Sequence, residues 1–116
     1  FCMPSMSEPG GISQLEALCC GSLVVARATG GLRDTIFPLR PGAEGIEGNG
    51  FLFTDYSSRA FYDAMERAHK FLVESDEDTI YQARMNAERS VYFWDRPARQ
   101  YIEKCYDIKE IIRTID

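Results

Sequence analysis

One stretch decides how this chain folds: residues 3–18, which read MPSMSEPGGISQLEAL. A short apolar strand, residues 1–3, leaves a sheet at Pro4, and a polar loop, two glycines and an amphipathic helix beginning near Gly11 follow. Glycine permits a positive φ and leaves no Cβ in the way of a ligand. The first turn of a helix has unpaired N–H groups and a positive dipole end. We therefore expect the Gly10–Gly11 loop to bind a phosphate or a cluster of hydroxyls, and Ser13 adds a hydroxyl there.

Two carboxylates flank this loop. Glu8 lies just before the expected helix, and Glu16 lies about a turn and a half inside it. One acid can face a ligand at the helix start while the other reaches a different part of that ligand. Alternatively, Glu8 caps the helix and Glu16 is a solvated surface acid, since acids are common at helix N-termini. The spacing alone leaves both interpretations open.

The apolar pattern that follows predicts a strand–helix–strand unit. The helix ends at Gly21 and presents to the sheet an apolar face made of Ile12, Leu15, Leu18 and Cys19. Residues 23–26 predict a buried parallel strand. A second pair of glycines, within residues 27–31, follows that strand. Because ligands gather at the carboxyl ends of strands in open α/β sheets, we expect the two Gly-Gly loops to lie side by side.

The second half of the chain reads as loop, strand and helices. Residues 38–50 contain two prolines and four glycines and predict a mobile loop in which Arg40 and Glu44 are solvated. Residues 51–53 predict a strand, and helices are expected over 59–73, over 79–90 and from Asp95 onward. His69 is expected to be structural or exposed. The expected apolar stripe of the first of these helices is Ala60, Phe61, Ala64, Met65, Ala68, Phe71 and Leu72; that of the second includes Ile80, Ala83, Met85 and Ala87.

Composition and charge narrow the class of protein. The chain has 116 residues, of which 45% are hydrophobic and 27% charged, which is typical of one folded domain. The net charge of −5 argues against a general nucleic-acid surface. No apolar run approaches the roughly 20 residues of a membrane span, so we expect a cytoplasmic protein. The four cysteines fit no zinc pattern and are expected to be small buried hydrophobes without disulfides.

Three segments in order resemble the GT-B glycosyltransferases. Residues 8–18, EPGGISQLEAL, resemble their donor-binding motif, in which seven residues separate two glutamates. Residues 28–36, ATGGLRDTI, and 48–53, GNGFLF, are similar to segments of the glycogen and starch synthases. The likeness covers most of the chain and ends with residues 92–94, YFW.

The resemblance implies a fold and a site. The fold would be α/β, with a Rossmann-like parallel sheet and flanking helices, and residues 1–116 would form one domain that is the incomplete C-terminal half of a GT-B donor-binding domain, truncated at its N-terminus. The final helix would leave Tyr101, Ile108, Ile111 and Ile112 exposed. No cofactor and no metal are implied. The catalytic residue would be Glu8, and the donor-binding residues would be Gly10, Gly11, Ile12, Ser13, Glu16, Thr29, Gly30 and Gly31.

The implied reaction is the retaining transfer of glucose from ADP-glucose or UDP-glucose to the 4-hydroxyl of an α-1,4-glucan. The partners would be the nucleotide sugar and, through a missing N-terminal domain, the glucan. In the family an upstream Arg and Lys offset the charge of the diphosphate, and we do not expect Arg27 and Arg33 to replace them. This segment alone would then bind the donor weakly and catalyse nothing.

Three departures from the synthase pattern leave the nucleotide base open. Ser13 stands where the synthases usually have Thr, Glu16 where many bacterial glycogen synthases have Tyr, and Gly10 where a bulkier residue is usual. Two alternatives remain: a non-catalytic nucleotide-sugar-binding module and a relative of the sugar-nucleotide epimerases. The two segments 29–31 and 48–53 weigh against the epimerase.

Overall fold

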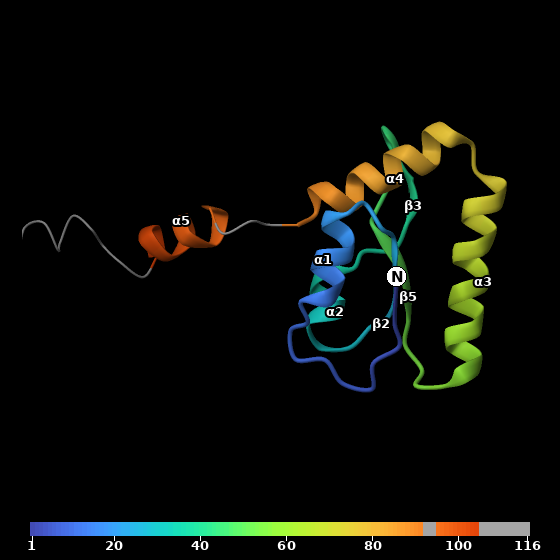
Figure 1. Cartoon of the computed structure of the whole chain (residues 1–116), viewed down its shortest axis with the longest axis horizontal. Helices are drawn as coiled ribbons and strands as arrows, with labels where there is room; N and C mark the ends of the chain where they lie inside the picture. Colours follow the sequence, from blue (N-terminus) through green and yellow to red (C-terminus); the bar gives the residue numbers. More distant parts are fainter. Residues whose placement is uncertain (92–94, 105–116) are drawn as a thin grey trace, which may run out of the picture.

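A computed structural model describes residues 1–91 and 95–104 and shows three parallel strands between two layers of helices (Figure 1). The strands are β1 (Cys2–Met3), β2 (Val24–Arg27) and β5 (Gly50–Phe53), in the order β1-β2-β5. On one face lie α1 (Ser13–Cys19), α2 (Gly30–Thr35) and α4 (Glu77–Arg89), and on the other lies α3 (Ser58–Glu74). The predicted α/β class with a parallel sheet is confirmed.

The central strand is buried on both faces, as its apolar sequence predicts. Val24 and Ala26 pack into a cluster with Leu18 of α1 and Leu32 of α2. Val25 points to the opposite face and packs with residues of β5 and α3. Successive strand side chains alternate between faces, so the four residues of β2 hold both helical layers on the sheet.

The helix α1 ends at glycine, as expected, in a Schellman motif. The N–H of Gly21 donates to the carbonyl of Leu18 at 2.8 Å, and the N–H of Ser22 donates to that of Ala17 at 3.0 Å. Gly21 has φ +70°, which an L side chain rarely adopts. The start of the helix differs from the prediction, because it lies at Ser13 with Ile12 as N-cap. Ile12 is 70% exposed and does not belong to the apolar face.

The predicted loop over residues 38–50 contains a small antiparallel hairpin, so that prediction was wrong for its centre. The strands are β3 (Arg40–Gly42) and β4 (Gly45–Glu47), and Arg40 forms an exposed ion pair with Glu47 at 3.4 Å. The hairpin is fixed to α4 by two amide side chains. Gln82 accepts from the N–H of Ile46 at 3.1 Å, and Asn86 donates to its carbonyl at 2.7 Å. Three-residue strands that contain proline and glycine show no alternating pattern of apolar and polar residues, so they could not be predicted from the sequence.

The long helices α3 and α4 form as predicted, with capped N-termini. Ser57 Oγ accepts from the N–H of Ala60 at 3.1 Å, and Asp76 accepts from the N–H of Thr79 at 2.7 Å. Part of the expected α3 stripe is wrong: Met65 is 39% exposed and Leu72 is 51% exposed. The residues that do pack on the sheet are Ala60, Phe61, Ala64, Ala68 and Phe71.

The cysteines also differ from expectation. Cys2 and Cys20 are exposed and Cys19 is half-buried, and all three are free thiols. Both exposed cysteines stand at ends, Cys2 on a sheet edge and Cys20 at a helix C-cap, where neighbours cover less of a side chain. Cys105 lies outside the described residues.

The remaining predictions concern His69 and the C-terminal part. His69 is exposed on α3, as one of the two predicted alternatives has it. Helix α5 (Asp95–Lys104) is present, and Tyr101 is 60% exposed as expected. Residues 92–94, Ile108, Ile111 and Ile112 lie outside the described residues. Among the helices described over 1–91 and 95–104, none is long and apolar enough to span a membrane.

Candidate functional site

The two Gly-Gly loops meet at the carboxyl edge of the sheet, where the sequence predicted that they would. The first loop follows β1 and the second follows β2, and these strands are parallel neighbours. The N–H of Gly31 donates to the carbonyl oxygen of Glu8 at 3.0 Å. Glu8 and Thr29 therefore lie on the same side of the molecule.

The approach of the two loops requires glycine in the second. A Cβ at Gly30 would overlap the carbonyl oxygen of Glu8, and a Cβ at Gly31 would overlap that of Gly10. Gly30 also has φ +47°, in the left-handed region. Thr29, in extended conformation, is the N-cap of α2, which begins directly at Gly30. Thus two backbones touch where side chains would otherwise separate them.

Arg27, the last residue of β2, joins the loops that follow all three strands. Its Nη1 donates to the carbonyl of Met6 at 2.7 Å, and its Nε donates to the carbonyl of Thr54 at 2.9 Å. The guanidinium carbon stands 5.4 Å from the ring centroid of Tyr56, in a cation–π contact. The loop that carries Glu8 is thereby bound to the end of β5.

Arg33, the other nearby cation, also binds backbone. Its Nη2 donates at 3.1 Å to the carbonyl of Ala28, which lies two residues before α2. Both arginines are thus engaged by carbonyl oxygens.

The predicted acids take different positions around the first loop. Glu8 is half-buried and stands four residues before the N-cap of α1, so the interpretation of Glu8 as a helix cap is wrong. Glu16 is exposed in the first turn of α1, close to the helix start rather than a turn and a half inside. Ser13 is exposed as the first residue of the helix, directly after the loop.

Sequence reasoning missed one side chain at the centre of this arrangement. Gln14 is fully buried, and its Nε2 donates to the carbonyls of Gly10 at 3.0 Å and Gly11 at 3.2 Å. Gly11 has φ +78°, and a Cβ there would overlap the Gln14 amide. A glutamine in a helix usually faces water, so only the position of Gln14, three residues after Gly11, could have indicated its role.

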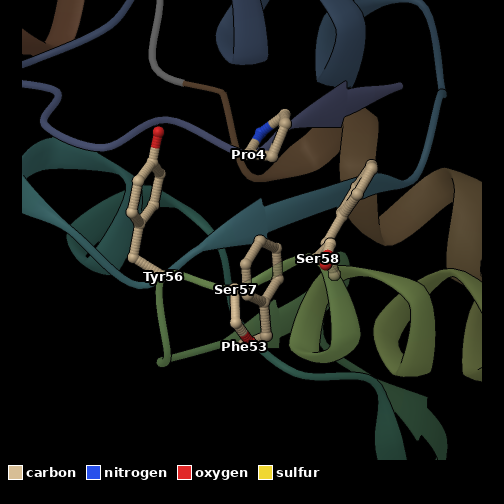
Figure 2. Close-up of a pocket in the computed structure, with 6 residues that line it drawn as sticks. Pro4, Phe53, Tyr56, Ser57 and Ser58 are labelled. Carbon is tan, nitrogen blue, oxygen red and sulfur yellow. The ribbon is translucent and has the colours of Figure 1, made fainter.

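A cavity of about 320 Å³ opens at the same edge of the sheet (Figure 2). Pro4, which follows β1, lines it with Phe53, Tyr56 and the first residues of α3. Its lining contains none of the residues that the sequence predicts to bind a donor. Within residues 1–91 and 95–104, no group of three or more His, Cys, Asp or Glu side chains is placed to hold a metal ion.

Comparisons with known proteins agree with this architecture. The chain is 40% identical over 101 residues to the glycogen synthase of Desulfitobacterium hafniense (strain DSM 10664 / DCB-2), which is 87% of this chain and 21% of the relative. It is 39% identical over 108 residues to the glycogen synthase of Clostridioides difficile (strain 630), covering 93% of this chain and 22% of the relative. The chain thus spans about a fifth of the length of the curated relatives it matches.

Solved structures show the same fold. The catalytic domain of starch synthase IV from Arabidopsis thaliana, bound to ADP and acarbose, superposes with a TM-score of 0.72 at 34% identity, over 89% of this chain and 21% of that one. The sucrose-phosphate synthase of Thermosynechococcus elongatus superposes with a TM-score of 0.62 at 24% identity, over 98% of this chain and 24% of that one, and shows the fold alone. A family model described as glycosyl transferases group 1 matches residues 1–86, and the chain belongs to that family.

Proposed function

We propose that this chain forms the donor-binding part of a retaining glucosyltransferase that acts on α-1,4-glucan. The donor is ADP-glucose or UDP-glucose, and glucose passes to a 4-hydroxyl of the glucan. The relatives named glycogen synthase support this reaction class, and the starch synthase, whose structure contains ADP and acarbose, supports a nucleotide and a glucan-like ligand. The chain covers about a fifth of each of these proteins, so the reaction belongs to the whole polypeptide.

One observation carries this proposal: the contact between the two Gly-Gly loops at the strand ends. The Gly31-to-Glu8 hydrogen bond of 3.0 Å brings together segments that are 23 positions apart in sequence, counted from residue 8 to residue 31. A diphosphate attached to a sugar and a ribose is extended, so its binding site needs groups from more than one loop. Backbone N–H groups of glycines can bind phosphate and hydroxyl oxygens without a charged side chain.

Each predicted site residue receives a role in this proposal. Glu8 binds hydroxyls of the donor glucose and stabilises positive charge at its anomeric carbon. Ser13 binds a phosphate oxygen, and Glu16 binds the ribose hydroxyls. The remaining contacts come from the backbone of the first loop, at Gly10, Gly11 and Ile12. The second loop contributes through Thr29, Gly30 and Gly31, of which the N–H groups of Thr29 and Gly31 already donate to the carbonyls of Arg27 and Glu8.

The charge of the leaving diphosphate requires cations, and the two arginines nearest the loops do not offer theirs freely. Stabilising developing negative charge is a large term in group transfer. Arg27 and Arg33 already donate to backbone carbonyls at 2.7–3.1 Å. We therefore propose that residues 1–116 alone bind the donor weakly and do not catalyse transfer.

The test compares a glutamate at the site with one on the hairpin. Glu8→Gln keeps the size of the side chain and removes its charge, and Glu44→Gln makes the same change at an exposed position. In the whole polypeptide, Glu8→Gln should lower kcat for glucan synthesis at least about 100-fold, the scale of one lost electrostatic contact. Glu44→Gln should leave kcat unchanged, and both variants should keep the melting temperature.

Equal activity of the two variants would contradict the role of Glu8. Calorimetry with ADP-glucose and UDP-glucose identifies the nucleotide base of the donor. Together with the assay of glucan synthesis, it distinguishes an enzyme from a protein that only binds the nucleotide sugar. A whole polypeptide that binds a nucleotide sugar without forming glucan is the non-catalytic module. Glucan synthesis by the isolated 116 residues would contradict the proposed need for outside cations.

A further inference from the structure

The side chain of Gln14 lies beneath the first Gly-Gly loop and holds its peptide groups. It is fully buried, and its Nε2 stands 3.0 Å from the carbonyl oxygen of Gly10 and 3.2 Å from that of Gly11. Both neighbours are acceptors, so the amide must present its NH2 group to them. The carbonyls of two successive residues therefore point into the protein.

The direction of these carbonyls fixes the direction of the next N–H groups. In a trans peptide the C=O and the following N–H point to opposite sides, and no cis peptide bond occurs in the part of the chain described. With the carbonyls of Gly10 and Gly11 turned inward, the N–H groups of Gly11 and Ile12 point outward. Among residues 1–91 and 95–104, no protein acceptor binds either N–H.

The hydroxyl of Thr35 extends the same network to the other loop. Gln14 Nε2 stands 3.4 Å from Thr35 Oγ1, and this hydroxyl donates to the carbonyl of Gly31 at 2.8 Å. Thr35 is the last residue of α2, whose first turn contains Gly31. One buried amide and one hydroxyl thus join the backbones of both Gly-Gly loops from below.

We propose that Gln14 is a positioning residue for donor binding, because it turns the N–H groups of Gly11 and Ile12 toward the ligand. This inference rests on the proposed function, whose nucleotide-sugar donor is that ligand. The Oε1 of the same amide is buried without a hydrogen-bond partner in the described part of the chain. A buried unsatisfied acceptor lowers stability, so the contribution of this side chain is the orientation that its NH2 group imposes on the loop.

The chain offers a matched control in a second buried amide, Asn49. It is 1% exposed, accepts from the N–H of Phe37 at 2.7 Å and donates to the Thr35 carbonyl at 3.0 Å and to Ser90 Oγ at 2.9 Å. It contacts neither Gly-Gly loop through these bonds. Its loss should lower stability as much as the loss of Gln14, while the orientation of the first loop stays unchanged.

The experiment compares Gln14→Met with Asn49→Leu in the whole polypeptide, by the KM and Kd for ADP-glucose and UDP-glucose. Gln14→Met should raise both constants about tenfold, as expected for two weakened hydrogen bonds, with a smaller change in kcat. Asn49→Leu should lower the melting temperature similarly and leave KM and Kd unchanged. Thr35→Val, which removes the hydroxyl, should raise KM less, and Thr35→Ser should restore it.

Equal donor affinity of Gln14→Met and the unmodified protein would overturn the inference. A loss of donor affinity in Asn49→Leu as large as that in Gln14→Met would overturn it as well. If Gln14→Met does not fold, two other measurements test the inference: the KM values of Thr35→Val and Thr35→Ser, and the rate of proton exchange of the Gln14 NH2 group in the wild-type protein. Exchange as fast as that of a surface glutamine would overturn the inference, and slow exchange would support it. A wild-type polypeptide that binds neither nucleotide sugar would overturn the proposed function itself.

Discussion

The substitution Gly30→Ala tests whether the contact between the two loops depends on the missing Cβ. The new carbon would overlap the carbonyl oxygen of Glu8 and would stand 2.8 Å from its carbonyl carbon. Two carbons in contact are normally about 3.5 Å apart, and the oxygen belongs to backbone that cannot rotate away. The loops must then separate, and the Gly31-to-Glu8 hydrogen bond of 3.0 Å is lost.

The expected cost follows from three contributions. Alanine at φ +47° costs about 1–2 kcal/mol. Overpacking costs typically about 1–3 kcal/mol, and the lost backbone hydrogen bond costs about 1 kcal/mol. We expect the free energy of unfolding to fall by about 3–6 kcal/mol, a large part of the roughly 5–15 kcal/mol of a typical domain.

Urea denaturation measures this change, and Gly10→Ala is its control. A Cβ at Gly10 would have nothing within 4 Å, so that variant should change the free energy of unfolding by less than about 1 kcal/mol. Donor affinity, measured by calorimetry, should fall in Gly30→Ala because the second loop is displaced. A Gly30→Ala protein with the wild-type midpoint and slope would refute the steric argument.

Three further predictions concern the support of the site and the helices. Arg27→Met removes the bonds to Met6 and Thr54 and should destabilise the protein by about 1–3 kcal/mol in urea, and Arg27→Lys should not restore this, since a lysine lacks the fork of donors. Leu18→Ala, at a fully buried position, should cost about 2–5 kcal/mol, measured the same way; a loss below 1 kcal/mol would contradict its place in the core. Hydrogen bonds from Thr79, chiefly from its backbone N–H and to a lesser extent from its hydroxyl, hold the pKa of Asp76 below its ordinary value of 3.8. A depressed pKa gives stability that is complete above 3.8 and lost as pH falls through the folded pKa, so Asp76→Asn should unfold with less acid sensitivity below pH 3.8, and identical pH profiles would disprove this.

The sequence predicted those parts of the fold that depend on apolar runs and on glycine. The predicted strand over residues 23–26 is continuously apolar and overlaps β2 at residues 24–26, and Gly21 ends α1 as expected. The adjacency of the two Gly-Gly loops followed from the rule that parallel strands end at one edge. These features depend on local pattern and on simple topology, which a single sequence contains.

Other features depend on tertiary contacts that no local pattern reports. The hairpin over residues 40–47 exists because Gln82 and Asn86 of α4 bind its backbone. Ile12 looked like part of an apolar face but stands at the corner before the helix and is 70% exposed. The buried amides Gln14 and Asn49 were unexpected because residue type places both at the surface. Their burial is a consequence of backbone carbonyls in the interior that need donors.

Gln14 and the two arginines share one task, which is to bind backbone carbonyls near the carboxyl ends of the strands. Gln14 holds the carbonyls of Gly10 and Gly11, and Arg27 holds those that follow β1 and β5. Loops without regular secondary structure have no ladder of their own to satisfy these groups, so side chains supply the bonds. A loop held in this way keeps one conformation before a ligand arrives, which reduces the ordering cost of binding. In the proposed site, a side chain that lies beneath the loop can therefore decide how tightly the donor binds.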